Sequence, residues 1–253
     1  MYVLEYKFYP DTKKIRIEDY LIDLWSYSAE LMTSGQIADY TTILNHKIPR
    51  QIIVSHERNS LSSRFHTTIA LKAYKEILDK SDRKPSIKIL GTAPEAGPVC
   101  HCKRPSSVYF LTTYFSYESP LRCGQCKRPI PIYRFKLTRE RLLGIKLWKE
   151  AHNRCDGLFV GSGVGEHWGH KQVASFSSRL SKDAYELCRN IEKEIKIPTY
   201  YYLNKYYGRS KKDEKRRKCP KCGGKWLLEK PWHDYFHFKC YRCKLISNIA
   251  WDV

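Results

Sequence analysis

Cysteines are the residues of this chain whose type and spacing could do chemistry, and their most regular group stands near the C-terminus. Two C-x-x-C pairs, separated by seventeen residues, have the spacing of a four-cysteine zinc site. Each pair forms a tight knuckle with both sulfurs on one side, and two facing knuckles complete a tetrahedron around Zn²⁺. The predicted ligands are Cys219, Cys222, Cys240 and Cys243. The alternative interpretation is two disulfides.

A second cysteine group lies in the middle of the chain. It has a C-x-C pair, twenty intervening residues and a C-x-x-C pair, which predicts a second structural zinc site. The predicted ligands are Cys100, Cys102, Cys123 and Cys126. Two alternatives stay open: His101 could replace one of the sulfurs, or only the C-x-x-C pair matters, through packing.

The remaining candidates for catalysis are weaker. Cys155 and Cys188 are left over and are expected to be small buried hydrophobes. Residues 161–170 are glycine-rich and carry Glu166, His167 and His170, but a surface turn leading into a helix is the favoured interpretation. Both zinc sites would have four protein sulfurs and no open position for water, which is the structural arrangement. The sequence therefore predicts a protein that is not an enzyme.

The compartment decides between zinc and disulfides. The N-terminus has no signal-peptide pattern, and no stretch approaches the roughly eighteen uncharged residues of a membrane helix. We therefore expect a cytoplasmic protein with no membrane partner and no small-molecule substrate. Cytoplasmic thiols stay reduced, so ten cysteines indicate metal rather than disulfides.

The elements that must position these groups follow from hydrophobic periodicity. Strands are expected at residues 2–9, 51–54 and 86–90, alternating with helices at residues 17–31 and 61–78. The helix at 17–31 would bury Tyr20, Leu21, Leu24, Trp25, Ser28 and Leu31. Further along, the pattern predicts a strand within residues 108–115, helices at 139–152 and 181–195, and two ribbon strands at 225–228 and 235–239. Ser181 is the expected N-cap of the helix at 181–195.

The predicted fold class is α+β, in three parts. Residues 1–95 form an N-terminal mixed α/β unit, and residues 96–198 form a central cysteine-rich α+β part with the first cluster. Residues 199–253 form a basic, tyrosine-rich linker followed by a C-terminal zinc ribbon.

Charge points to polyanionic partners. The chain has 46 Lys and Arg against 26 acidic residues, a net charge of +20, and 19 tyrosines. Cations beside aromatic rings are typical of surfaces that bind single-stranded nucleic acid. The candidate contacts lie between residues 201 and 218: Tyr201, Tyr202, Lys205, Arg209, Lys211, Lys212, Lys215, Arg216, Arg217 and Lys218. The alternative is a solvated linker next to a strand whose tyrosines are partly core.

Several motifs resemble an uncharacterised bacterial family described as Zn-ribbon-containing proteins with a suggested nucleic-acid-binding role. They are PVCHC at residues 98–102, ESPLRCGQC at 118–126, GE at 165–166, IPTYYYL at 197–203, CPKCGGKW at 219–226, PWH at 231–233, FKCYRC at 238–243 and LISNIAW at 245–251. Members of that family are often neighbours of Rhs-type polymorphic toxin genes. The resemblance therefore implies immunity proteins that bind a toxin.

Two functions compete. The first is a non-enzymatic zinc-ribbon protein that engages nucleic acid or a nucleoprotein assembly, which the charge favours. The second is a cytoplasmic immunity protein that neutralises a cognate Rhs-type toxin by direct binding, which the resemblance implies. Exposed residues of the helices at 17–31 and 61–78 would then contribute to the toxin contact.

Overall fold

The computed structural model describes residues 1–93, 96–161 and 163–253, and the chain divides into two compact units. Unit 1 comprises residues 1–99, 117–119 and 128–143, and unit 2 comprises residues 100–116, 120–127 and 144–253. Each unit has its own sheet. The chain is therefore a mixed α+β protein, as predicted, whereas the three-part division at residues 95 and 198 stays a prediction.

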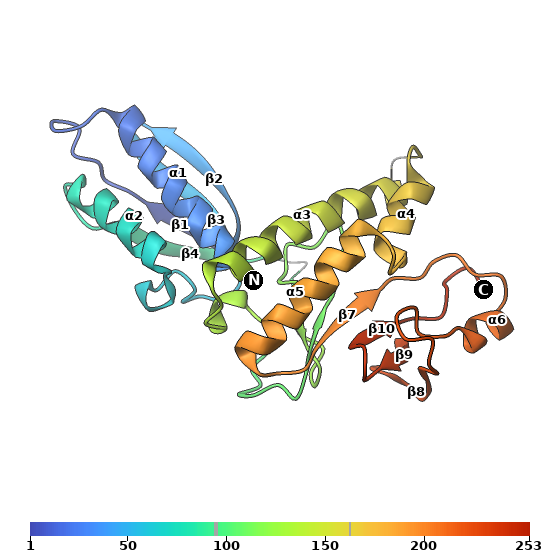
Figure 1. Cartoon of the computed structure of the whole chain (residues 1–253). Helices are drawn as coiled ribbons and strands as arrows, with labels where there is room; N and C mark the ends of the chain where they lie inside the picture. Colours follow the sequence, from blue (N-terminus) through green and yellow to red (C-terminus); the bar gives the residue numbers. More distant parts are fainter. Residues whose placement is uncertain (94–95, 162) are drawn as a thin grey trace. The chain divides into compact units, whose positions relative to one another are not determined.

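The sheet of unit 1 is antiparallel, with the strand order β2-β3-β1-β4. Its strands are β1 (Tyr2–Lys7), β2 (Ile37–Asn45), β3 (Ile48–Ser55) and β4 (Ser86–Thr92). Helix α1 (Ile17–Thr33) connects β1 to β2, and α2 (Thr68–Asp79) connects β3 to β4 (Figure 1). This β-α-β-β-α-β order is the ferredoxin-like motif. The short 3-10 turns Ser63–Phe65 and Ile132–Arg134 also belong to unit 1.

The core of unit 1 lies between its sheet and its two helices. Leu4, Tyr6 and Phe8 of the first strand region are buried, as their alternation predicts. Helix α1 buries Tyr20, Leu24, Tyr27, Ser28 and Leu31. The prediction for Trp25 is wrong: its side chain is 68% exposed, because it lies about 100° around the helix from Leu24.

The strands expected at 2–9, 51–54 and 86–90 are confirmed, and so is the helix at 17–31. Strand β2 has no counterpart in the prediction because most of its residues are exposed and give little alternation. The second helix begins at Thr68 rather than Leu61, since the side chain of Thr67 accepts a hydrogen bond from the Ala70 N–H and caps it.

The sheet of unit 2 has six strands in the order β6-β5-β7-β10-β9-β8. They are β5 (Val108–Phe110), β6 (Leu121–Cys123), β7 (Thr199–Leu203), β8 (Leu227–Trp232), β9 (Phe236–Cys240) and β10 (Leu245–Ser247). Strand β7 runs parallel to both β5 and β10, and the other neighbours are antiparallel. The tyrosine-rich β7 therefore joins the hairpin of the first cysteine group to the ribbon of the second.

Two helices cover one face of this sheet, and aromatic rings fill the other. The helices of the region are α3 (Arg139–Gly161), which belongs to unit 2 from Gly144 on, α4 (Glu166–Ala174), α5 (Arg179–Ile195) and α6 (Lys211–Arg216). The ring of Phe110 lies 4.4 Å from that of Trp148 in α3, and the Tyr201 hydroxyl lies 3.2 Å from Ser181 Oγ in α5. Tyr109, Tyr200, Phe236 and Ile246 form a separate buried cluster, because successive strand residues point to opposite faces.

Helices α3 and α5 are both longer than predicted. Helix α3 continues to Gly161, well beyond residue 152. The N-cap of α5 is Ser178, whose hydroxyl accepts a hydrogen bond from the Ser181 N–H, so Ser181 is not the cap. Across the described ranges, no helix is both long and apolar enough to cross a membrane.

Candidate metal centres and cationic surface

The first cysteine group is assembled at one end of the β5–β6 hairpin. Strand β6 ends at Cys123, which pairs with Val108, and the C-x-C pair precedes β5. The sulfurs of Cys100, Cys102, Cys123 and Cys126 all lie within 4.8 Å of one another. His101 is exposed and contributes no atom to this group. The four-sulfur set is therefore the one that the fold brings together.

The second group is assembled in the same way by β8 and β9. The sulfurs of Cys219, Cys222, Cys240 and Cys243 also lie within 4.8 Å of one another. The Sγ atoms of Cys222 and Cys240 are 3.8 Å apart. Four sulfurs at 2.3 Å from a tetrahedral Zn²⁺ are roughly 3.8 Å from one another, so the donor set fits this ion.

Backbone N–H groups point at the sulfurs, as a bound thiolate requires. Cys100 Sγ accepts from the Cys102 N–H at 3.3 Å, and Cys123 Sγ accepts from the Gln125 N–H at 3.4 Å. In the second group, Cys240 Sγ accepts from the Cys243 N–H at 3.3 Å. Such donors stabilise negative charge on sulfur.

Each C-x-x-C knuckle closes with a left-handed residue. The φ angles are 66° at Lys127, 69° at Gly223 and 53° at Lys244. Only Gly223 is a glycine, the residue that this conformation favours. The knuckle geometry is therefore kept even where a side chain makes it less favourable.

The thiol pKa values show what a metal would change. Burial raises the pKa of the Cys100 and Cys243 thiols, whereas a hydrogen bond from the Gly224 backbone lowers the pKa of Cys222 to about 7. Thiols with a raised pKa keep their protons at neutral pH, and a metal ion must displace them because the thiolate is the ligand. Metal binding should therefore release protons.

The knuckle of the first cysteine group contacts the turn between β8 and β9. Lys127 Nζ, just after the first knuckle, donates to the His233 carbonyl at 3.2 Å. A Cβ on Gly124 would lie 3.1 Å from the Trp232 ring and 2.0 Å from Ser107 Oγ. Gly124 thus lets the tip of the ribbon approach the first knuckle closely.

The predicted nucleic-acid contacts separate into three sets. Six cations are exposed: Arg209, Lys211, Lys212, Lys215, Arg216 and Lys218. Lys205 is partly buried, and its backbone N–H and carbonyl both bond the Asn248 side chain, at 2.9 and 2.6 Å. The remaining three, Tyr201, Tyr202 and Arg217, lie within the fold.

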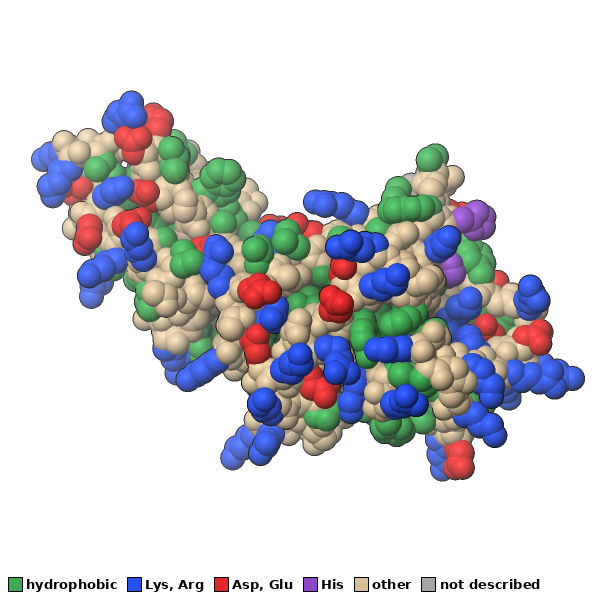
Figure 2. Space-filling view, in the orientation of Figure 1, with side chains coloured by type: hydrophobic (Ala, Val, Ile, Leu, Met, Phe, Trp, Pro, Cys, Tyr) green, Lys and Arg blue, Asp and Glu red, His purple; other side chains and the backbone are tan. Residues whose placement is uncertain are grey.

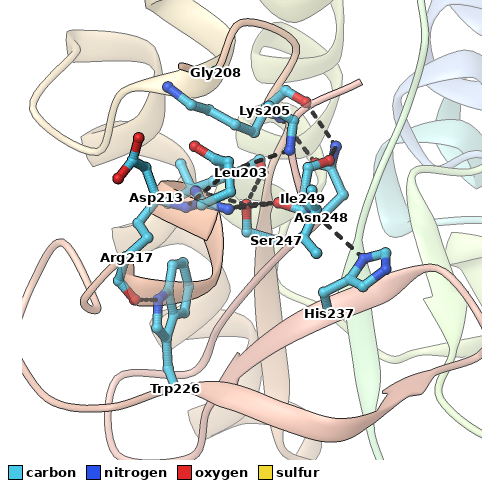
Figure 3. Close-up of polar contacts among 12 residues, drawn as sticks. Leu203, Lys205, Gly208, Asp213, Arg217, Trp226, His237, Ser247, Asn248 and Ile249 are labelled. Atoms are coloured by element: carbon cyan, nitrogen blue, oxygen red, sulfur yellow. Dashed lines mark hydrogen bonds and ion pairs between the residues drawn. The ribbon is translucent and has the colours of Figure 1, made fainter. Parts of the chain in front are cut away.

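We call the basic segment at residues 205–218 the arm. Arg217 holds this arm to the ribbon rather than facing solvent (Figure 3). Its guanidinium donates to Ser247 Oγ at 3.2 Å and to the Asn248 carbonyl at 2.5 Å, and it lies 4.3 Å from the centre of the Phe238 ring. It also pairs with the buried Glu214. The arm is therefore not a free linker: it forms the short helix α6 and is anchored at its end.

The two tyrosines are part of the packing. Tyr201 is 1% exposed and has no ring face for a base. The Tyr202 hydroxyl bonds Tyr235 Oη at 2.7 Å and Asn248 Oδ1 at 2.9 Å. Their position agrees with the alternative interpretation, in which the tyrosines of this strand are partly core.

Exposed cations gather around hollows of unit 2. The arm hollow, of about 580 Å³, is lined by Lys215, Arg216, Arg217, Lys218, Lys225, Trp226 and Leu227. The α4 hollow, of about 350 Å³, includes Lys171, Lys205 and Lys218 in its lining. Figure 2 shows basic side chains outnumbering acidic ones over the region of β7–β10 and α6. The predicted contacts did not include Lys171 and Lys225. These lysines lie outside residues 201–218, and no charge pattern in the nearby sequence marks them.

The glycine-rich loop proves to be the start of helix α4. Glu166 accepts a hydrogen bond from the Tyr207 hydroxyl, and His170 Nε2 accepts from the Tyr206 N–H at 3.3 Å. These side chains bond the segment that follows β7. The expected turn into a helix is confirmed for the described residues, and Ser162 lies outside them.

With two four-cysteine clusters that can hold metal ions, the chain is a zinc-ribbon-like protein. Residues 102–204 match the family model "Domain of unknown function (DUF2310)", and residues 208–253 match "Domain of unknown function (DUF8594)". A Haemophilus influenzae protein described as "Uncharacterized protein" is 39% identical over 150 residues, which cover 58% of this chain and 73% of that protein. The chain belongs to the family of this protein.

Another Haemophilus influenzae "Uncharacterized protein" is 38% identical over 149 residues, 58% of this chain, and the chain spans 57% of its length. Among solved structures, a conserved protein from Methanosarcina mazei Go1 matches 37% of this chain and 95% of its own, with 14% identity and a TM-score of 0.31. An antibiotic biosynthesis monooxygenase matches 37% of this chain and 100% of its own, with 11% identity and a TM-score of 0.32. At these TM-scores neither likeness carries an argument about this chain.

Proposed function

We propose that this chain is a non-enzymatic protein with two structural Zn²⁺ sites that binds nucleic acid, alone or within a nucleoprotein assembly. The arm hollow carries the proposal. Five of its seven lining residues are cations, and none is acidic. Arg217 anchors the arm, and the other four cations are exposed: Lys215, Arg216, Lys218 and Lys225. Such a surface favours the phosphate backbone, whose binding releases counterions.

The local charge supports the same proposal. Residues 199–253 contain 14 Lys and Arg against 5 Asp and Glu, an excess of 9. Of the two acids within the arm, Glu214 is buried against Arg217 and Asp213 accepts from the Ser210 hydroxyl at the start of α6. Internal bonds thus engage the arm's acids and leave its exposed cations available.

We propose zinc as the metal because tetrahedral sets of four thiolates suit this ion. With four sulfurs in each group, the protein supplies all four ligands and leaves no position for a substrate or water. A structural role follows, in which the ion holds the two cysteine pairs of each group together. Metal analysis of the purified chain should give two zinc ions per molecule, and one ion or none would contradict the assignment.

The nucleic-acid proposal is tested by fluorescence anisotropy with labelled oligonucleotides over a series of salt concentrations. We expect affinity to fall steeply with salt. The triple variant Lys215→Ala/Arg216→Ala/Lys218→Ala should lower the salt slope by roughly 0.7 per lost contact with single strands. Lys72→Ala/Lys75→Ala/Lys84→Ala removes three exposed cations from unit 1 and is the matched control. No binding at low salt would overturn the proposal.

A second candidate is the neutralisation of a polymorphic toxin, and one observation favours a protein contact. Helices α1 and α2 expose large apolar side chains: Ile22 at 60%, Trp25 at 68%, Ile69 at 42% and Leu71 at 44%. Exposed tryptophan is typical of the residues that anchor protein interfaces. The candidate partner would be a toxin domain encoded beside this protein.

This candidate is tested by co-expression with the toxin domain encoded next to this chain. The full chain should protect cells, and Ile22→Ala/Trp25→Ala should reduce protection without lowering the amount of folded protein. Exposed charged residues of the same helix give the control Glu18→Ala/Asp19→Ala. If the full chain gives no protection, toxin neutralisation is excluded and nucleic acid remains.

A further inference from the structure

A third hollow in unit 2, of about 430 Å³, lies where the end of α5 meets the last knuckle of the ribbon. We call it the α5 hollow. Five of its seven lining residues are cations: Arg189, Lys193, Lys196, Arg242 and Lys244. They come from two segments about fifty residues apart in sequence, so no run of charge marks this site.

The positive charge of the α5 hollow is largely uncompensated. Glu192 is its single acidic lining residue, and its carboxylate accepts a hydrogen bond from the Thr199 N–H at 3.0 Å. Within residues 1–93, 96–161 and 163–253, none of the five cations forms an ion pair. Cations gathered in this way repel one another, and a bound anion relieves that repulsion.

Two of these lysines occupy backbone positions that favour glycine. The φ angle is 58° at Lys196, the C-cap of α5, and 53° at Lys244, just after the knuckle. At the corresponding place after the other knuckle of the ribbon, the chain has Gly223. The backbone therefore gives no reason for lysine at either position, whereas a need for charge in the hollow does.

Aromatic rings stand beside the hollow. Tyr241 precedes the lining residue Arg242 and is 63% exposed. Lys239 Nζ lies 5.1 Å from the centre of the Tyr241 ring and 4.6 Å from that of Tyr200. Lys244 Nζ lies 5.3 Å from the Tyr200 ring. An exposed ring next to grouped cations is the combination on which unpaired bases stack while their phosphates are bound.

We propose that the α5 hollow binds the phosphates of a single-stranded nucleic acid, with Tyr241 stacking on one of its bases. The inference rests on the proposed function and specifies the class of nucleic acid that is bound. In a duplex the bases are stacked and paired, so Tyr241 has no ring partner there. Single strands should therefore bind more tightly than duplexes.

The test uses the full zinc-loaded chain with a labelled fifteen-residue oligo-dT strand and a labelled hairpin duplex. Arg189→Ala/Lys193→Ala should weaken binding of the single strand at least roughly tenfold and lower its salt slope by roughly 1.4. Both residues are exposed and lie on α5, outside both four-cysteine groups. Lys72→Ala/Lys75→Ala, which makes the same charge change in unit 1, should have neither effect.

Tyr241 is tested separately. Tyr241→Ala should weaken binding of the single strand roughly tenfold with the salt slope unchanged, and Tyr241→Phe should retain binding. Zinc content and thermal unfolding show whether each variant is folded. If Arg189→Ala/Lys193→Ala binds as tightly as the wild type while Lys215→Ala/Arg216→Ala/Lys218→Ala binds less tightly, the α5 hollow is not a binding site. The proposed function would still stand. Equal affinity for the duplex would overturn the single-strand assignment, and no binding by the wild type would overturn both proposals.

Discussion

Units 1 and 2 differ in the length of their strands and in where the cysteine groups lie. The strands of unit 1 have six to nine residues, and β1, β2 and β3 contribute buried side chains to one apolar cluster. In unit 2, three of the six strands have only three residues. Such short strands are marginal by themselves, and unit 2 is also where both cysteine groups lie. We therefore expect bound metal to stabilise the short strands of unit 2, whereas the longer strands of unit 1 should not depend on it.

Removal of metal should have the largest effect, and it should affect unit 2 much more than unit 1. A strong chelator should reduce hydrogen-exchange protection of β5 to β10 by about a thousandfold or more, because the binding energy of structural zinc is folding energy. Strands β1 to β4 should remain protected, since their unit holds no such cluster among its described residues. Exchange followed by mass spectrometry distinguishes the units. Equal loss of protection in both would show that unit 1 depends on the metal as well.

Replacement of a single cysteine ligand should have the next largest effect on stability. Cys240→Ser should remove one metal ion and lower the free energy of unfolding by more than about 4 kcal/mol. Cys155→Ala is the control, because Cys155 is buried but belongs to neither group, and it should cost about 1 kcal/mol. Metal content and denaturant unfolding measure both. Similar losses for the two variants would mean that the second group acts through packing alone.

The contact between the first knuckle and the turn between β8 and β9 is tested by the substitution Gly124→Ala. The added Cβ would meet Ser107 Oγ, the Ser107 carbonyl and the Trp232 ring, so we expect a loss of about 2 kcal/mol. Gly91→Ala in unit 1 is the control, since nothing lies within 4 Å of its Cβ. Urea midpoints compare the variants. A tolerated Gly124→Ala would show that the turn does not need to approach the knuckle.

The smallest effect concerns the pH dependence of unit 1. Burial lowers the pKa of His66 to about 4, below the value of about 6.5 in an unfolded chain. The unfolded state therefore binds the extra proton first, and stability is lost as pH falls from 6.5 toward 4. Between pH 7.5 and 5.5 the wild type should lose about 1 kcal/mol more than His66→Gln. Parallel pH profiles for the two proteins would remove His66 as the cause.

Much of unit 1 could be predicted because its signals are local. Alternation in β1 and helical spacing in α1 both report which residues face a core. Strand β2 escaped because an exposed edge strand does not need alternating side chains. Trp25 was misplaced for the related reason that periodicity marks a stripe but not its edge.

The sequence by itself determined the two cysteine groups, because C-x-x-C knuckles are local turns whose spacing is set by the metal they suit. Only the tertiary structure decided that β7 lies between the two hairpins, since its partners are β5, about ninety residues earlier, and β10, about forty residues later. That pairing buries Tyr201, and the ribbon packed beside it anchors Arg217. It also brings Arg189 and Arg242 to one hollow. Burial and charge at these positions depend on contacts between distant segments, and no local pattern records them.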